Sequence, residues 1–324
     1  MQFTLAELEA AADLVHRAHP ATPQYAWPQL SAALGAEVWV KHENHGPTGA
    51  FKARGGITFI DWLTRTHPDC PGIITATRGN HGQSQARAAT AAGLRAVVYV
   101  PQGNSPEKNA AMRAFGAELR EHGADFDTAR EEAMRMAETE GLMPVPPFHR
   151  ELVRGVASYG LEFFRAAPPL DVVYVPIGCG SGICGTIAAR DALGLDTQIV
   201  GVVATGAPTA KLSFEAGRPV PSDAATTFAD GLAVRVPVPE ALAIYSRGAA
   251  RIVAVSDDEI AQAARLYFTA THNVAEGAGA AALAAALQDA ARIKGRRVGV
   301  ILSGGNLDAG AFAQILRGDT PNPG

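Results

Sequence analysis

Residues 43–56 read Glu-Asn-His-Gly-Pro-Thr-Gly-Ala-Phe-Lys-Ala-Arg-Gly-Gly, a turn rich in glycine and proline that presents one lysine, Lys52. An alternating segment comes just before it, in which Val38 and Val40 predict a strand with one buried face. Small and apolar neighbours would desolvate the ammonium of Lys52 and lower its pKa, and Arg54 would lower it further by like-charge repulsion. Such a lysine can act as a nucleophile or form a Schiff base, whereas most lysines are solvated surface groups.

Length and composition describe an ordinary globular protein of about two domains. The chain has 324 residues, of which 47% are hydrophobic and 19% charged, and its formal net charge is −4. It has no basic block, no apolar run near the roughly 20 residues of a membrane span and no signal-peptide pattern, so we expect neither nucleic-acid nor membrane partners. Cys70, Cys179 and Cys184 form no CxxC pair, which is typical of a reduced, cytoplasmic protein.

Apolar strands alternate with helices along the chain. Strands are expected at residues 72–76, 95–100, 171–175, 198–204 and 298–302, and helices at 57–66, 83–92, 106–115, 127–140, 152–165 and 278–293. Capping boxes at Thr4–Glu7 and Ser256–Glu259 predict two more helix starts. Apolar strands that alternate with helices predict parallel sheets covered on both faces, which is an α/β fold. The segment around residues 144–150, rich in His and Pro, is the expected crossing between domains.

A glycine-rich turn follows the strand expected at residues 171–175. Residues 178–185 read Gly-Cys-Gly-Ser-Gly-Ile-Cys-Gly, and such a turn lets backbone N–H groups and a helix N-terminus approach an anion. It therefore predicts a phosphate site, with a purely structural turn as the alternative. The spacing Gly180-x-Gly182-x-x-Gly185 also fits a dinucleotide fingerprint, which requires an acidic residue about 20 positions on. The next strand ends at residues 202–205 without a carboxylate, which argues against a nicotinamide-dependent dehydrogenase.

Two more polar turns follow predicted strands. Residues 77–83 read Thr-Arg-Gly-Asn-His-Gly-Gln, and the carboxyl end of a parallel strand is where ligands bind in such sheets. Asn80 and Gln83 can hydrogen-bond a small polar ligand, and the first amides of the next helix suit a carboxylate. Residues 303–306 read Ser-Gly-Gly-Asn after the last buried strand. A helix cap in the first turn and an ordinary glycine loop in the second are the structural alternatives.

Together these four stretches resemble the serine and threonine dehydratase group of pyridoxal-phosphate enzymes, the β-family related to serine racemase and phenylserine dehydratase. The resemblance runs over essentially the whole chain, with the motifs in the family's order. It implies pyridoxal 5'-phosphate as cofactor, an amino acid as small-molecule substrate and a homodimer. It also implies two doubly wound open-sheet α/β domains of the tryptophan synthase β-like architecture, fold type II. The large domain would comprise residues 1–51 and 150–324, and the small domain residues 52–149.

The resemblance also assigns roles to individual residues. Residues 48–55 look like the family's lysine segment, with Ala50 where serine is usual, so Lys52 would carry the cofactor as a Schiff base. Residues 178–181 are similar to the family's four-glycine phosphate loop. The cofactor would be bound by Phe51, Lys52, Asn80 (at its 3-hydroxyl), Gly178, Cys179, Gly180, Ser181, Gly182, Gly231, Glu276 and Ser303 (at its ring nitrogen). The substrate would be bound by Thr77, Arg78, Gly79, Asn80, His81 and Gln83.

The implied reaction is β-elimination of water from a β-hydroxy-α-amino acid, giving a 2-oxo acid and ammonia. Lys52 and Arg78 are the expected catalytic residues, and Lys52 would remove the α-proton. A serine at position 303 makes the cofactor a weaker electron sink than a carboxylate would, which suits elimination. Arg78 stands where serine racemase has a serine that acts as second base, and a guanidinium is a poor base at pH 7. Arg78 instead indicates a bulky or acidic β-substituent, as in phenylserine or hydroxyaspartate.

Several alternatives remain open. Val203 stands where metal-dependent members have a glutamate ligand, so no metal is expected at that position. A β-replacement synthase or an amino-acid racemase would have the same fold, although the continuation His81-Gly82-Gln83 favours a dehydratase. A nicotinamide-dependent dehydrogenase and a non-catalytic ligand-binding protein belong to other functional classes, and the identity of the bound cofactor separates them from a pyridoxal-phosphate enzyme.

Overall fold

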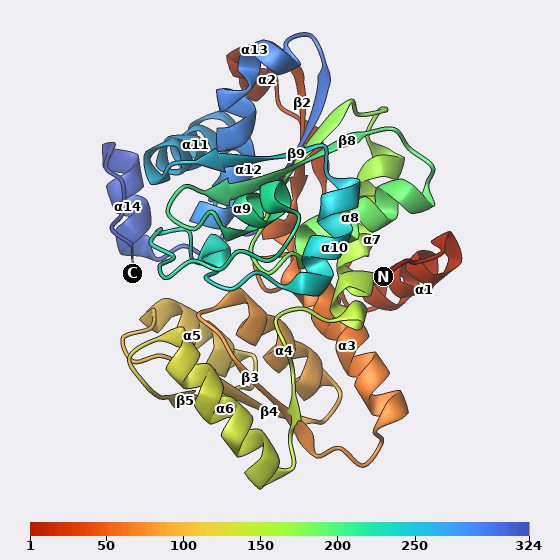
Figure 1. The fold of residues 1–324 in the computed structure, drawn as a ribbon, viewed down its shortest axis with the longest axis vertical. Coiled ribbons are helices and arrows are strands. Elements are labelled where there is room, and N and C mark those ends of the chain that lie inside the picture. The colour runs from red at the N-terminus through yellow and green to blue at the C-terminus, as the bar shows by residue number, and fades with distance from the viewer. Residues whose placement is uncertain (324) are drawn as a thin grey trace.

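Two sheets organise residues 1–323, the part of the chain that the computed structural model describes (Figure 1). The larger sheet has the strand order β1-β2-β10-β7-β8-β9, and only β1 runs antiparallel to its neighbour. Its strands are β1 (Gln24–Ala26), β2 (Glu37–His42), β7 (Val172–Pro176), β8 (Gln198–Ala204), β9 (Arg251–Val255) and β10 (Arg297–Leu302). Parallel strands end at the same edge of a sheet, so the loops after β2, β7 and β10 lie on one side of the molecule.

Helices cover both faces of the larger sheet and bury one apolar cluster on each. The first face packs against α2 (Pro28–Leu34), α11 (Asp257–Thr271) and α12 (Gly277–Gln288). The second packs against α7 (Arg150–Ala166), α8 (Ser181–Ala192) and α10 (Pro239–Gly248). The remaining elements of this part are α1 (Leu5–His16), η1 (Glu43–His45), α9 (Thr209–Ala216), η2 (Asp230–Leu232), α13 (Ala290–Ile293) and α14 (Ala309–Arg317).

The smaller sheet has the order β5-β4-β3-β6 and is parallel throughout. Its strands are β3 (Gly72–Ala76), β4 (Arg95–Val100), β5 (Glu118–Glu121) and β6 (Met143–Pro144). One face is covered by α3 (Lys52–Thr66), α4 (Asn80–Ala91) and α5 (Pro106–Ala114), and the other by α6 (Phe126–Glu140). The predicted α/β fold of parallel sheets covered on both faces is therefore confirmed. The domain boundaries at residues 51/52 and 149/150 stay a prediction.

The local sequence signals place most elements to within a few residues. Both capping boxes are present, with Thr4 and Ser256 accepting a hydrogen bond from the third residue of their helices. The helix expected over residues 278–293 is instead two helices that meet at Asp289. Several short elements were not predicted: β1, α2, β5, β6, α9, α10, β9 and α14. Within residues 1–323, no helix is both long and apolar enough to cross a bilayer.

One boundary correction matters for function, because α3 begins at Lys52 and not at residue 57. Gly55 and Gly56 are poor helix formers and made the first turn look irregular in the sequence. In the structure they allow close packing: a Cβ at Gly55 would lie 2.8 Å from the carbonyl oxygen of Leu152, and one at Gly56 would lie 2.4 Å from Ser84 Oγ. The first turn of α3 is thus wedged between α7 and α4, which fixes the position of Lys52.

Candidate active site

Three of the predicted motifs meet at the carboxyl ends of β2, β7 and β10. The lysine segment and the Ser303 turn are joined by backbone hydrogen bonds: the Phe51 N–H donates to the Ser303 carbonyl at 3.1 Å, and the Gly305 N–H donates to the Gly49 carbonyl at 2.9 Å. An isolated bridge between Ala50 and Gly304 continues this contact. Segments separated by about 250 positions in the sequence therefore form one wall of the candidate site.

Lys52 is the first residue of α3 and is partly buried. Its Nζ lies 5.0 Å from the centroid of the Phe51 ring, and its backbone carbonyl accepts a hydrogen bond from Ser84 Oγ at 2.6 Å. Burial lowers the pKa of Lys52, while the nearby Cys179 and Glu276 oppose that shift. A lowered pKa increases the fraction of neutral amine, the form that both a nucleophile and a general base require.

Arg54 does not act on Lys52 as predicted. It is fully buried in an ion network, where its Nε donates to Glu43 Oε2 at 2.7 Å and its Nη1 to Glu162 Oε1 at 2.5 Å. Lys41 Nζ donates to the second oxygen of Glu162 at 2.5 Å. The two carboxylates neutralise the guanidinium, and Arg54 does not contribute to the lowered pKa of Lys52. This set of Lys41, Glu43, Arg54 and Glu162, called here the Arg54 network, ties α3 to β2 and α7.

The glycine-rich turn leads from β7 into α8. Gly180 caps the helix with φ of 100°, a conformation that L side chains rarely adopt, and no side chain caps the first amides of α8. A Cβ at Gly178 would lie 2.1 Å from the carbonyl oxygen of Gly231, so the turn packs directly on the second glycine segment. A Cβ at Gly182 would lie 3.6 Å from Phe51 Cζ. The uncapped N-terminus of α8 therefore lies beside the ring that Lys52 contacts.

The turn after β3 presents a second uncapped helix N-terminus. The helix α4 begins at Asn80, three residues before the predicted start, and no side chain caps it. Thr77 Oγ1 accepts a hydrogen bond from the Gly79 N–H at 3.0 Å, which shapes the turn. His81 and Gln83 are buried, and burial together with the charge of Lys52 lowers the pKa of His81 to about 3. His81 is therefore neutral, and the free amides of the first turn are the anion-binding groups here.

Asn80 is held in position by hydrogen bonds to two side chains from distant segments of the chain, Glu276 and Asn306. Its Nδ2 donates to Glu276 Oε1 at 2.7 Å, and its Oδ1 accepts from Asn306 Nδ2 at 2.7 Å. Asn306 also donates to the Thr48 carbonyl at 2.8 Å, so it links three motifs. Burial raises the pKa of Glu276 to about 7, and Lys108 and the Asn80 hydrogen bond only partly oppose this. In the sequence, Asn306 is only the last residue of the turn at 303–306, and no local pattern indicates that it contacts Asn80 and residue 48.

Arg78 faces the carboxylate of Asp230 in η2. Its Nη1 lies 3.9 Å from Oδ1 of Asp230 in η2, and about a third of each side chain is exposed. Lys108 of α5 donates to the other oxygen of Asp230 at 2.5 Å. Sequence reasoning missed Lys108, because no local pattern marks a lysine on α5 as a neighbour of residues 77–80. Arg78 and Lys108 therefore both pair with Asp230, next to the turn at residues 77–83 that is expected to bind the substrate.

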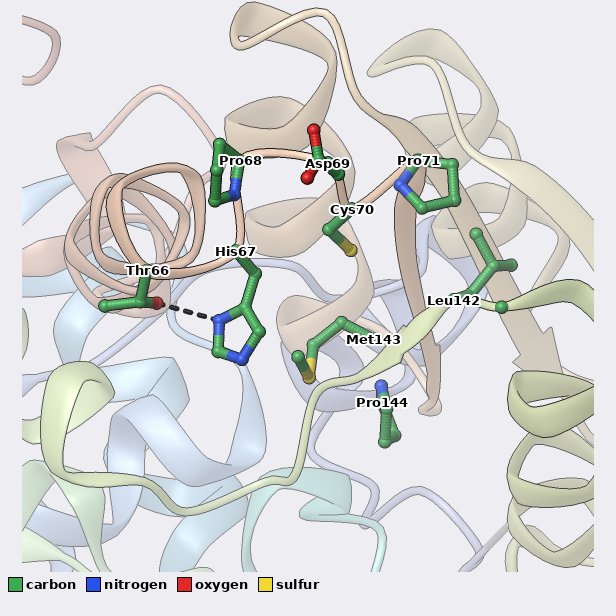
Figure 2. Close-up of a pocket in the computed structure, with 10 residues that line it drawn as sticks. Thr66, His67, Pro68, Asp69, Cys70, Pro71, Leu142, Met143 and Pro144 are labelled. Atoms are coloured by element: carbon green, nitrogen blue, oxygen red, sulfur yellow. Dashed lines mark hydrogen bonds between the residues drawn. The ribbon is translucent and has the colours of Figure 1, made fainter.

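A hollow of about 490 Å³ lies elsewhere, in the smaller sheet's part of the molecule (Figure 2). It is lined by residues 66–71 at the end of α3 and by residues 141–144 at the start of β6. Gly72 begins β3 next to it, so the hollow lies at the amino-terminal edge of the sheet. Thr77 and Asn80 lie at the opposite edge, where parallel sheets bind ligands, and the hollow is therefore separate from the candidate site.

The structure gives no group of three or more His, Cys, Asp or Glu side chains that could hold a metal ion, as far as residues 1–323 are concerned. Val203 is buried in the apolar cluster on the α7 face of the larger sheet. An isopropyl group in this environment offers no oxygen ligand to a hard cation. The expected lack of a metal at this position stays a prediction.

The donors gathered here fit pyridoxal phosphate. A partly buried lysine with a lowered pKa suits the aldehyde, and the uncapped first turn of α8 suits the phosphate. The close packing of Gly178 on Gly231 leaves no room for side chains between the two segments that would line the cofactor. Ser303 lies at the carboxyl end of β10, beside the lysine segment. The contacts that the resemblance assigned to each residue remain a proposal.

Comparison with known proteins supports the same cofactor. Residues 15–304 match the sequence model of a family described as pyridoxal-phosphate dependent enzyme. The chain is 33% identical to the L-threonine ammonia-lyase of Thermotoga maritima over 288 residues, which are 89% of this chain and 71% of that protein. It is 32% identical to the biosynthetic L-threonine dehydratase of Pasteurella multocida, where the match covers 89% of this chain. The chain spans only 56% of that longer relative.

Solved structures show the same fold over nearly the whole chain. The processed form of threonine deaminase isoform 2 from Solanum lycopersicum superposes with a TM-score of 0.90 at 28% identity, covering 98% of this chain and 94% of that one. Maize serine racemase gives a TM-score of 0.91 at 25% identity, with 98% of both chains covered. The predicted fold type II architecture and the predicted cofactor are confirmed. The chain therefore belongs to the pyridoxal-phosphate-dependent enzyme family, within the group of threonine and serine dehydratases that its four motifs resemble.

Proposed function

We propose that the protein catalyses β-elimination of water from a β-hydroxy-α-amino acid, which yields a 2-oxo acid and ammonia. The observation that carries this proposal is the placement of one amine with a lowered pKa between two uncapped helix N-termini. One terminus, on α8, suits a phosphate, and the other, on α4, suits a carboxylate. The names of the similar proteins, threonine ammonia-lyase and threonine dehydratase, support the same reaction type.

Each group in the site has a separate role in the proposed reaction. Bound pyridoxal phosphate supplies an aldehyde for the substrate amine and a conjugated ring that takes up the electron pair left at Cα. The amides at the start of α4 hold the substrate carboxylate, which orients the Cα–H bond. Lys52 Nζ accepts the α-proton, and its lowered pKa favours the neutral amine that this step requires. Asn80 is kept in position by Glu276 and Asn306.

The β-substituent of the substrate is the finer part of the proposal. Arg78 follows Thr77 directly in the turn at residues 77–83, and its side chain is about a third exposed. A planar cation at this place suits an aromatic ring, as in phenylserine, or a carboxylate, as in hydroxyaspartate. It does not suit proton abstraction, which makes racemisation a side activity even though serine racemase shares the fold.

A substrate panel tests the proposed reaction. Purified protein with pyridoxal phosphate is incubated with the isomers of serine, threonine, phenylserine and hydroxyaspartate, and 2-oxo acid and ammonia are measured. We expect equal amounts of both products from at least one β-hydroxy amino acid. Formation of a D-amino acid without 2-oxo acid would instead assign a racemase, and products that need an added thiol or second amino acid would assign a β-replacement synthase.

Cys179 offers a test of the phosphate loop. It is partly buried, and its thiol is close enough to Lys52 that each group affects the pKa of the other. Cys179→Asp is expected to weaken cofactor binding by about 10- to 150-fold, which corresponds to about 1.5–3 kcal/mol for one hydrogen bond to a charged group. Cys179→Asn has nearly the same shape without the charge and is the matched control. Equal cofactor dissociation constants for the two variants, measured by equilibrium dialysis, would place the phosphate elsewhere.

Assembly and location are further parts of the proposal. The resemblance supports a homodimer, and the cysteine pattern supports the cytoplasm. Sedimentation equilibrium of the holoenzyme measures the assembly directly, and a mass equal to the 33.7 kDa monomer at micromolar concentration would contradict the homodimer.

A further inference from the structure

The carboxylate of Asp230 in η2 lies between two cations, Arg78 in the turn after β3 and Lys108 of α5. Oδ2 of Asp230 accepts from Lys108 Nζ at 2.5 Å, and Oδ1 lies 3.9 Å from Arg78 Nη1. Each oxygen of the carboxylate therefore has its own cation. This arrangement shows that the side chains of Arg78 and Lys108 can reach one carboxylate group together.

The side chain of Lys108 packs against the turn at residues 77–83, the proposed substrate loop. A Cβ at Gly79 would lie 3.0 Å from Lys108 Cδ, so the aliphatic part of the lysine lies against the loop between Arg78 and Asn80. Its side chain is only 13% exposed, whereas Asp230 is 32% exposed. The lysine is thus a fixed part of the loop's surroundings, while the aspartate has access to water.

Several charged groups lie around the turn at residues 77–83. Arg78 and Lys108 bring two positive charges, and Asp230 brings one negative charge. Burial lowers the pKa of Lys108, but Asp230, Glu276 and Asp308 more than offset this effect and raise the pKa of the lysine. Glu276 is itself partly protonated near neutral pH, because burial raises its pKa to about 7. Asp308 also acts on Lys108, and Asp125 on Arg78, but Asp230 is the carboxylate that pairs with both cations, so an anionic ligand that displaced it would meet both.

We propose that Arg78 and Lys108 form a second carboxylate subsite, which selects substrates that carry a carboxylate on Cβ, and that Asp230 fills this subsite when no substrate is bound. This inference rests on the proposed β-elimination and names its substrate class. The first amides of α4 hold the α-carboxylate, and the two cations at the neighbouring position hold the second one. Asp230 turns toward water as the substrate carboxylate replaces it. A phenyl ring would gain little from Lys108, because a compact ammonium pairs with charge better than with apolar surface.

A binding measurement tests the subsite without any turnover. Succinate has two carboxylates and butyrate has one on the same four-carbon chain, and neither can be eliminated. We expect the holoenzyme to bind succinate at least about 10-fold more tightly than butyrate, measured by isothermal titration. Lys108→Met should weaken succinate binding by about 10- to 150-fold, which is the contribution of one charge-assisted contact. Asp230→Asn should instead tighten succinate binding, because the internal competitor loses its charge.

Controls separate a local effect from a loss of structure. Lys108→Arg keeps the charge and is expected to recover most of the succinate affinity that Lys108→Met loses. Circular dichroism and cofactor content show whether each variant is folded and loaded. Equal binding of succinate and butyrate to the wild type, or an equal loss of both in Lys108→Met with no recovery in Lys108→Arg, would overturn the subsite. Weaker succinate binding in Asp230→Asn would overturn the role given to Asp230.

Steady-state kinetics connect the subsite to the reaction. We expect kcat/KM for hydroxyaspartate to fall in Lys108→Met by about 10- to 150-fold relative to kcat/KM for serine, mainly through KM. If kcat/KM in Lys108→Met fell by the same factor for hydroxyaspartate, phenylserine and serine, the subsite would be contradicted, but the proposed β-elimination would not. No 2-oxo acid from any β-hydroxy amino acid would contradict the proposed function instead, and the succinate measurement would still decide the subsite.

Discussion

Lys52→Ala is expected to lower turnover by at least about 10²- to 10⁴-fold, the range that loss of a general base produces. A methyl group can neither carry the cofactor nor accept a proton, so both roles proposed for Nζ disappear in one substitution. The fold should survive, because the contacts of this residue to Ser84 and to the Ser303 turn run through the backbone of residues 51 and 52. Formation of 2-oxo acid by wild type and variant, at equal cofactor concentration, gives the comparison.

Two controls identify the role of the amine. Lys52→Arg keeps the positive charge but stays protonated at pH 7, so it should be as inactive as the alanine variant. Borohydride reduction of the wild type followed by peptide mass mapping should place the cofactor on Lys52. The other lysines are Lys41, Lys108, Lys211 and Lys294, and a reduced adduct on any of these would remove the basis of the assignment.

Glu162→Gln is expected to lower the free energy of unfolding by about 3–5 kcal/mol, the cost of breaking a buried ion pair from one side. Glu162 accepts hydrogen bonds from both Arg54 and Lys41, and it is only 8% exposed. Without its charge, two buried cations would share Glu43 alone. Urea denaturation of the wild type and the variant at pH 7 measures the difference. A loss below about 1 kcal/mol, the range of exposed pairs, would show that the Arg54 network is not a main anchor of α3.

The pH dependence of that loss gives an independent check. Burial raises the pKa of Glu162, but Arg54 and Lys41 outweigh it and hold the pKa at about 2, below the ordinary 4.5. A lowered pKa stabilises the fold above the unfolded-state value, and this stabilisation is lost as the pH falls through the folded-state value. The difference between the two proteins should therefore be constant above pH 4.5 and shrink between pH 4.5 and about 2. Glu9→Gln is the matched control, because Glu9 pairs with Arg165 at the exposed surface.

The Arg54 network and the activity of Lys52 are linked through α3. Arg54 is two residues after Lys52, and its ion pairs fix the first turn of the helix to β2 and α7. A weakened Arg54 network should therefore also lower the activity of the folded protein, because Lys52 would lose its fixed position. The resulting fall in kcat should be smaller than that of Lys52→Ala.

Features that depend on neighbouring residues could be predicted from the sequence alone. The alternation of apolar strands and helices predicted the parallel α/β fold, since it follows from backbone hydrogen bonding and from burial on both faces of a sheet. The turns at residues 77–83, 178–185 and 303–306 were recognisable because glycine and small polar residues mark the ends of strands. A resemblance over the whole chain then joined these turns to Lys52 and to one cofactor.

The tertiary structure decided which charged groups meet. From the sequence, Arg54 was expected to repel Lys52, yet Glu43 and Glu162 neutralise it. Lys108 carried no local signal, and only the packing of α5 on the loop after β3 brings it to Asp230, 122 positions away. Spacing in the sequence fixes which residues share one helix or strand, but charge interactions depend on distance in space, and folding sets those distances between distant segments. The sequence by itself therefore determined the fold and the choice of Lys52 as candidate cofactor lysine, whereas the partners of Arg54, Arg78 and Lys108 depended on the folded arrangement.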